Sequence, residues 1–182
     1  MPQDESIAAR TLERPIGIEA RHLAPASSGW LRTSLTVVLI GGPLMAALLG
    51  WLGGGDEKIF AARGQQVSLA VETPDILRSG NWFETRVVVE PRADINDLAI
   101  AIDQPLWRGM SIDTTVPDAE KVDTLDDRFT YSFGPIKAGE RFVLKIDGQI
   151  QPRGLRRLEG KVAVLDGERR LIEVPVAVTV LP

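Results

Sequence analysis

The chain has 182 residues and a formal net charge of -4; 44% of its residues are hydrophobic and 25% are charged, proportions that exclude a disordered or fibrous chain. It contains no cysteine, which excludes disulfides, cysteine-ligated metal sites and cysteine nucleophiles. It has one histidine, His22. The acidic balance argues against a nucleic-acid partner, because proteins that bind nucleic acid carry a basic face.

The first 29 residues mix prolines, serines and scattered charges with no sustained hydrophobic period. Such a composition is typical of a polar tail rather than of a packed element. We therefore expect residues 1–29 to precede the folded part of the chain as a tail.

The next stretch, from Thr33 to Gly55, contains no charged residue. As a helix it would cover roughly 34 Å at about 1.5 Å per residue, more than the hydrocarbon core of about 30 Å. Trp30 and Trp51 stand near its two ends, where tryptophan rings favour the membrane interfaces. We predict a transmembrane helix over residues 30–55 that contacts the lipid bilayer, with both tryptophans as membrane-interface anchors.

The alternative for this stretch is a cleaved secretory signal, whose apolar core spans about 7 to 15 residues between a short basic region and a small-residue cleavage site. Here the apolar run is longer, follows a long tail, and lacks a clear cleavage pattern around Ala61 and Ala62. Arg21 and Arg32 precede the run, which favours a cytoplasmic N-terminus. We expect an uncleaved anchor in the inner (plasma) membrane, a cytoplasmic tail, and a periplasmic or extracellular C-terminal part.

Small side chains recur every four residues in the span, at Gly42, Ala46, Gly50 and Gly54. On a helix they share one face, where the backbone of a neighbouring helix can approach closely. The alternative is that glycine and alanine are simply frequent in membrane helices. The pattern predicts a helix-packing interface, with an integral membrane protein complex as the partner.

Beyond a short expected linker, residues 56–65, apolar residues alternate with polar ones, which is typical of half-buried strands. Seven such runs follow, and their apolar sets begin at Val67, Phe83, Leu98, Phe129, Phe142, Leu158 and Ile172. Asp166-Gly167 before the last run predicts a tight hairpin. Pro175 predicts that this last strand lies at a sheet edge or turns its missing N–H outward. The runs predict an all-β antiparallel sandwich over residues 66–182.

The turn sequence Lys-Ala-Gly-Glu at residues 137–140 precedes the expected strand 141–150. In this position it resembles the turn before a late strand in immunoglobulin-like and fibronectin type III-like modules of bacterial membrane-anchored envelope proteins. The likeness is one of pattern and covers residues 66–182. It implies an immunoglobulin-like sandwich behind a single transmembrane helix.

An acidic segment runs from Asp113 to Asp127. Its carboxylates are of the type that calcium prefers, but their spacing matches no calcium loop. We expect a solvated acidic surface, with a basic partner as a further use of the charge.

Basic residues gather late in the chain, and we single out Arg153, Arg156 and Arg157 as possible contacts for protein or lipid. The alternative is an exposed strand rim, where charge prevents unwanted pairing. Trp107 is a candidate for the same contact, as an interface anchor, or else a core residue.

The sequence contains no glycine-rich phosphate loop, and we expect no catalytic site, cofactor, metal or small-molecule substrate. It predicts a non-catalytic single-pass accessory subunit that stabilises or positions a larger inner-membrane complex, for which respiratory, photosynthetic, transport and secretion assemblies all qualify. The alternative is a tethered extracytoplasmic module that binds a ligand, glycan or partner protein. A hydrolase on a sandwich scaffold is a remote third.

Overall fold

The structure is a computed structural model, which describes residues 29–52, 57–151 and 154–182. In this part of the chain, one helix, α2, precedes eleven strands and a 3₁₀ helix, η1. The chain divides into two compact units within α2, between Gly42 and Pro43. The tail expected over residues 1–29 lies outside the described residues, apart from Gly29.

Helix α2 (Gly29–Leu48) has 20 residues, of which none is buried. At about 1.5 Å per residue it measures roughly 30 Å, the thickness of a hydrocarbon core. It is therefore an N-terminal apolar helix long enough to cross a membrane, as a signal sequence or an anchor would be.

The helix ends at Leu48, which is earlier than the expected boundary at residue 55. Gly50 has a φ of 75°, and its N–H donates to the carbonyl of Ala47 at 3.0 Å. The N–H of Trp51 donates to the carbonyl of Ala46, also at 3.0 Å. These two bonds form a Schellman motif, which ends helices at a glycine in the left-handed region. The predicted helix over residues 30–55 is thus too long at its C-terminal end.

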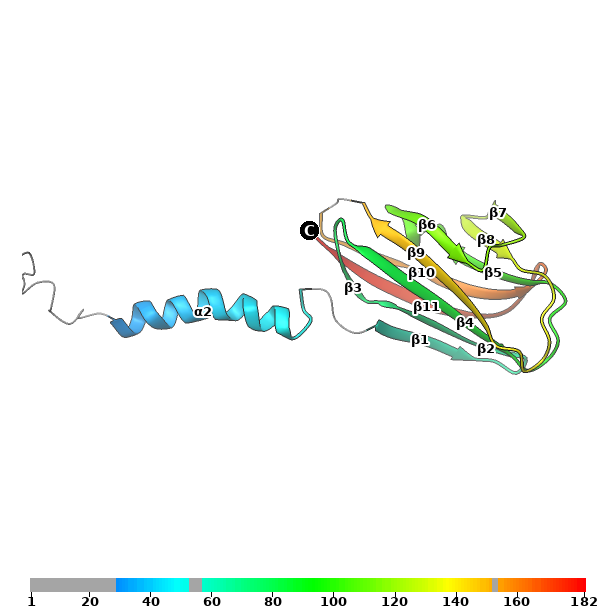
Figure 1. Cartoon of the computed structure of the whole chain (residues 1–182), viewed down its shortest axis with the longest axis horizontal. Helices are drawn as coiled ribbons and strands as arrows, with labels where there is room; N and C mark the ends of the chain where they lie inside the picture. Colours follow the sequence, from blue (N-terminus) through cyan, green and yellow to red (C-terminus); the bar gives the residue numbers. More distant parts are fainter. Residues whose placement is uncertain (1–28, 53–56, 152–153) are drawn as a thin grey trace, which may run out of the picture. The chain divides into compact units, whose positions relative to one another are not determined.

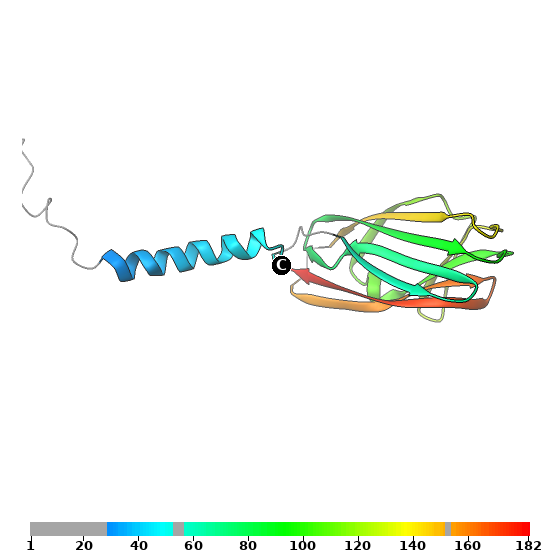
Figure 2. The same cartoon turned by 90° about the horizontal axis from the view of Figure 1, so that it is seen from below.

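The strands form two sheets, seen from two sides in Figures 1 and 2. The five-stranded sheet consists, in order, of β1 (Glu57–Arg63), β2 (Val67–Pro74), β4 (Trp82–Pro91), β9 (Phe142–Ile150) and β6 (Met110–Val116). The six-stranded sheet consists, in order, of β3 (Ile76–Arg78), β11 (Arg169–Leu181), β10 (Arg156–Asp166), β5 (Leu98–Asp103), β8 (Arg128–Ser132) and β7 (Lys121–Leu125). The fold is a two-sheet, mostly antiparallel β-sandwich. The prediction of a wholly antiparallel fold is wrong for one pair, because β3 runs parallel to β11.

The expected linker, residues 56–65, contains strand β1, whose residues pair with β2 from Glu57 opposite Pro74 to Arg63 opposite Ser68. This expectation was wrong because β1 is an edge strand that lacks the alternation of a half-buried strand. The first three residues of β1 are all exposed, and the third of them, Ile59, is 62% exposed.

Two local predictions about the last strands are confirmed. Asp166 pairs with Arg169 across a tight hairpin, in which Gly167 has a φ of 60°. Strand β3 pairs with β11 only over Thr179–Leu181. At Pro175, therefore, β11 has β10 on one side and no paired strand on the other, which is where a missing N–H is tolerated.

The core lies between the sheets and is built from the inward-facing residues of alternating strands. In β11, for example, every second residue from Val174 to Val180 is buried. Helix η1 (Gln104–Trp107) crosses from β5 to β6 and covers the core at one end. Gly160 of β10 permits this close approach, because an added Cβ would lie 2.9 Å from Cβ of Leu106.

The sandwich has two ends, which differ in the loops they carry. At the proximal end, proximal meaning close to α2 along the chain, β1 begins and η1, the β3–β4 turn and the ends of β9 and β11 gather. At the distal end lie the 92–97 loop, the 137–140 turn and the Asp166-Gly167 hairpin. In Figure 1 the C-terminus marks the proximal end of the sandwich.

Candidate interaction surfaces

The surface of α2 is largely apolar, and none of its residues is buried within the described part of the chain. Trp30 lies in its first turn and is 78% exposed, while Trp51 lies in the turn after the helix and is 67% exposed. Of the three predicted packing positions that the structure describes, Gly42 and Ala46 lie within the helix. A Cβ added at Gly42 would meet nothing within 4 Å, so this part of the helix surface is open.

The other two predicted packing positions are Gly50 and Gly54. Gly50 serves as the Schellman cap, so its conformation, not a neighbouring helix, accounts for the glycine. Gly54 lies outside the described residues. Of the three described positions of the predicted stripe, Gly42 and Ala46 therefore lie on the helix and Gly50 caps it.

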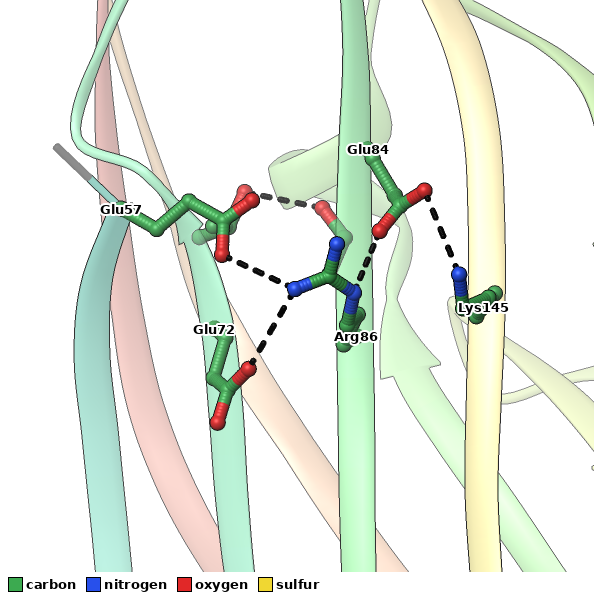
Figure 3. Close-up of polar contacts among 7 residues, drawn as sticks. Glu57, Glu72, Glu84, Arg86 and Lys145 are labelled. Atoms are coloured by element: carbon green, nitrogen blue, oxygen red, sulfur yellow. Dashed lines mark hydrogen bonds and ion pairs between the residues drawn. The ribbon is translucent and has the colours of Figure 1, made fainter. Parts of the chain in front are cut away.

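The outer face of the five-stranded sheet carries an ionic network centred on Arg86 of β4 (Figure 3). Its Nη1 lies 3.4 Å from Glu57 of β1 and 3.9 Å from Glu72 of β2. Its Nε pairs with Glu84, whose second oxygen lies 3.7 Å from Nζ of Lys145 on β9. The carboxylates, Glu57 first and Glu84 second, raise the pKa of Arg86. The network links four strands, and its charges largely neutralise one another.

Beneath this face lies a small polar contact in the core. The hydroxyl groups of Thr73 and Thr85 are buried and lie 2.8 Å apart, within hydrogen-bond distance. They line a cavity of about 10 Å³ together with Phe83 and Trp107. That volume suits a single water molecule and no organic ligand.

Trp107, a predicted candidate for a protein or lipid contact, is a core residue. Its side chain is 8% exposed, and its ring centroid lies 6.0 Å from the rings of both Phe129 and Tyr131. Burial raises the pKa of Tyr131. The hypothesis of Trp107 as an interface anchor is therefore wrong, because η1 turns the ring inward between the sheets.

The three predicted arginines separate in the structure. Arg153 lies outside the described residues, and Arg157 pairs with Glu159 two positions along β10. Arg156 is exposed and lines a surface hollow of about 10 Å³ together with Arg108. Neither Arg108 nor Arg156 has an ion-pair partner among the described residues. The sequence pattern missed Arg108 because it stands alone in a loop, far from the basic cluster in the sequence.

Two large apolar side chains are also exposed at the proximal end. Trp82, the first residue of β4, is 66% exposed, and Leu155, just before β10, is 70% exposed. Neither residue was singled out from the sequence. An exposed tryptophan in a strand costs favourable burial, so such residues often mark a contact surface.

The acidic segment is part of the sandwich rather than one loop. It contributes the end of β6, strand β7 and a tight turn in which Asp126 and Asp127 have φ values of 50° and 58°. Lys121 and Asp123 form an ion pair at 2.6 Å on β7. In the described ranges, no three acidic or histidine side chains gather as a metal site would require.

The comparisons with known proteins give a fold likeness and no family. No known protein family matches the chain. No curated protein matches it either. The human F-spondin reeler domain aligns with 73% of this chain and 96% of its own, at 14% identity and a TM-score of 0.36. A DNA-bound alkylpurine DNA glycosylase, AlkC of Pseudomonas fluorescens, aligns with 62% of this chain at 16% identity and a TM-score of 0.33.

The present chain covers 29% of the glycosylase chain. The likeness to the reeler domain is a weak one between β-sandwiches, and at these scores neither comparison carries a functional argument. The specific resemblance to immunoglobulin-like and fibronectin type III-like modules remains a prediction.

Proposed function

We propose that the protein is a non-catalytic, single-pass accessory subunit of a larger complex in the inner membrane. In this proposal α2 is an uncleaved anchor, the N-terminal tail is cytoplasmic, and the β-sandwich lies on the outer side. The observation that carries it is the apolar helix of 20 residues, none of which the described chain buries. Such a surface requires lipid or another protein around it.

The helix also supports a partner within the membrane. Gly42 and Ala46 lie about one turn apart on the same side of α2. At Gly42 the helix surface has room for the backbone of another helix. Small residues permit close helix packing, whose van der Waals contacts drive association in lipid. The sandwich then positions or stabilises the host complex from outside the membrane.

Solubilisation in mild detergent, followed by size analysis and identification of co-migrating proteins, tests the subunit proposal. We expect the native chain to migrate with a host complex and Gly42→Ile or Ala46→Ile to reduce that association, because a larger side chain separates the backbones. Leu44→Ile is the matched control, since Leu44 lies about 200° around the helix from Gly42. Gly50→Ile is unsuitable, because a φ of 75° strains any β-branched residue.

Migration of the native chain alone, as a protein of 19.9 kDa in its detergent micelle, contradicts the subunit proposal. Equal association of Ala46→Ile and Leu44→Ile would contradict the packing face while leaving the subunit intact.

The chain's lack of cysteine makes its orientation directly measurable. Single-cysteine variants Ser27→Cys and Glu168→Cys place one thiol before α2 and one in the distal hairpin. We expect a membrane-impermeant maleimide to label only the Glu168→Cys variant in spheroplasts. Labelling of the Ser27→Cys variant alone would reverse the orientation, and a mature protein lacking α2 would show a cleaved signal.

The second candidate, a tethered extracytoplasmic module that binds a partner protein, is favoured by strand β7. This strand is one of the two edge strands of the six-stranded sheet, and four of its residues, 121–124, are exposed. A free edge can accept a strand from another protein. Val122→Lys should weaken such binding, whereas Ile59→Lys on the opposite free edge, β1, is the matched control. Equal binding by both variants would argue against β7 as the binding site.

A further inference from the structure

The proximal end of the sandwich brings together two exposed apolar side chains and two arginines from distant parts of the chain. Trp82 pairs with Gln149 in the β4–β9 ladder. Ile150, the last residue of β9, and Gln151, which follows it, line the same hollow as Arg108 and Arg156. Leu155 directly precedes Arg156 in the chain. The four side chains therefore originate from neighbouring strands and loops at one end of the fold.

The charges at this end are unequally satisfied. Of the acidic side chains that the structure describes near the start of β1, Glu57 pairs with Arg86 at 3.4 Å and Asp75 pairs with Lys58 at 3.5 Å. Arg108 and Arg156, by contrast, have no acidic partner within the described ranges. Their hollow is lined by no carboxylate. It is therefore a local site of positive charge on a chain whose net charge is -4.

Arginine is well suited to bind phosphate, because its planar guanidinium group donates two parallel hydrogen bonds. Exposed tryptophan and leucine side chains suit the interfacial layer of a bilayer, where an aromatic ring is partly in contact with water and partly with lipid. The combination of both at one end matches a phospholipid surface better than it matches a soluble anion.

The connection to α2 limits how far this end can lie from the membrane. Four residues, 53–56, separate Leu52 from Glu57. Five Cα–Cα steps span at most about 18 Å, whatever conformation they adopt. Glu57 lies opposite Pro74 in the register, and the backbone carbonyl of the next residue, Asp75, accepts a hydrogen bond from the N–H of Thr179 at 2.8 Å. The start of β1 therefore belongs to the same end as the terminus of β11.

We propose that the proximal end docks on the bilayer surface, with the phosphate of an anionic phospholipid headgroup bound between Arg108 and Arg156. Trp82 and Leu155 enter the interfacial layer beside it. The inference rests on the anchoring role of α2 in the proposed function, and it does not depend on a host complex.

The test uses the full-length protein in nanodiscs, with an environment-sensitive fluorophore on a single cysteine. The label at Leu155→Cys should report an apolar environment in nanodiscs of phosphatidylglycerol and a more aqueous one in nanodiscs of phosphatidylcholine. The same label at Glu168→Cys, in the distal hairpin, should report water in both. Raised salt should weaken the response in phosphatidylglycerol, because it screens exposed charges.

The arginine requirement is tested in the same nanodiscs by Arg108→Gln and Arg156→Gln combined. Near an anionic surface each arginine contributes about 5-fold to binding, so the pair should lower the docking equilibrium roughly 25-fold. Arg63→Gln, which removes the same charge from the distal end of β1, is the matched control and should leave the response intact.

Three outcomes would overturn the proposal. A label at residue 155 that remains aqueous in both lipids, while the protein co-elutes with the nanodisc, excludes docking of this end. An equal response in both lipids excludes the anionic headgroup. A response to inorganic phosphate in phosphatidylcholine nanodiscs, matching that to phosphatidylglycerol, assigns the hollow to a soluble anion. Failure of the protein to enter nanodiscs at all contradicts the anchor in the proposed function instead.

Discussion

The distal and proximal ends of the sandwich differ in how they satisfy their charged groups. At the distal end, Asp166 accepts hydrogen bonds from the N–H groups of Asn96 and Asp97 at 2.9 and 3.1 Å. Asp94 similarly accepts from the N–H of Ala138 and from Nζ of Lys137, both at 2.9 Å. These carboxylates join the 92–97 loop to the β10–β11 hairpin and to the 137–140 turn, so the distal loops are held together by interactions within the sandwich.

The proximal end has the opposite character. Arg108 and Arg156 have no acidic partner in the described part of the chain, and Trp82 and Leu155 expose most of their surface. Its core also holds the paired hydroxyls and a small cavity beneath Trp107. Ion pairs and hydrogen bonds within the sandwich hold the distal loops, whereas the exposed apolar side chains and arginines of the proximal end are the features that the proposed docking on a bilayer explains.

The largest expected effect on the free energy of unfolding comes from Trp107, whose ring packs in the core near the proximal end. Trp107→Ala removes the ring that packs on Phe129 and Tyr131, and it should lower the free energy of unfolding by roughly 3–5 kcal/mol. Trp82→Ala is the matched control. Because Trp82 is exposed, this substitution should change the free energy of unfolding by no more than about 0.5 kcal/mol. Urea unfolding in detergent measures both; equal losses would contradict the assignment of one ring to the core and the other to the surface.

The next effect concerns the hydroxyl pair of the proximal core. Thr73→Val leaves the hydroxyl of Thr85 buried without its partner, which should cost roughly 1–3 kcal/mol of unfolding free energy. The double variant with Thr85→Val should recover part of this loss, because both polar groups are then gone. A double-mutant cycle measures the coupling, and strictly additive losses would show that the two hydroxyls act independently.

A smaller effect distinguishes the distal end. Burial works to raise the pKa of Asp166, but hydrogen bonds from Asp97 and Asn96 outweigh it, and the net pKa is lowered. A carboxylate with a lowered pKa stabilises the fold above its unfolded pKa of about 3.9, and this stabilisation is lost as the pH falls through the folded value. Asp166→Asn should therefore be less stable than the native chain at pH 7, with a smaller difference at pH 3. A constant difference between these pH values would contradict the role of the charge.

The smallest expected effect on stability is that of the proximal arginines. Arg108→Gln with Arg156→Gln should change the free energy of unfolding by no more than about 0.5 kcal/mol per site, since neither loses an ion pair in the described structure. The same denaturation experiment measures it. A loss as large as that of Thr73→Val would mean that these arginines serve the fold, and would remove the contrast between the two ends.

The sequence predicted the interior of the sheets and missed their edges. The seven alternating runs correspond to β2, β4, β5, β8, β9, β10 and β11, which are the seven interior strands. The four strands that it missed, β1, β3, β6 and β7, are the edges of the two sheets. Edge strands bury few side chains, so selection for burial leaves little alternation in them, as the exposed Val122 of β7 shows.

The candidate surfaces were only partly predictable, for two physical reasons. Arg156 was found because it stands in a cluster of like charge, whereas Arg108 is far from it in the sequence and joins it in the hollow only through the folding of the two sheets. Gly50 fitted a spacing of four residues, but local hydrogen bonds, not spacing, determine where a helix ends. From the sequence, Trp107 could be either an interface anchor or a core residue. The position of η1 on the core is what decides for the core.

The most direct test of the difference between the two ends measures how deeply one residue from each end lies in the membrane. Spin labels at Leu155→Cys and Glu168→Cys, in the full-length protein in phosphatidylglycerol nanodiscs, report collisions with oxygen and with a polar nickel complex. We expect interfacial values at residue 155 and aqueous values at residue 168. Aqueous values at both residues, with α2 inserted, would contradict docking of the proximal end.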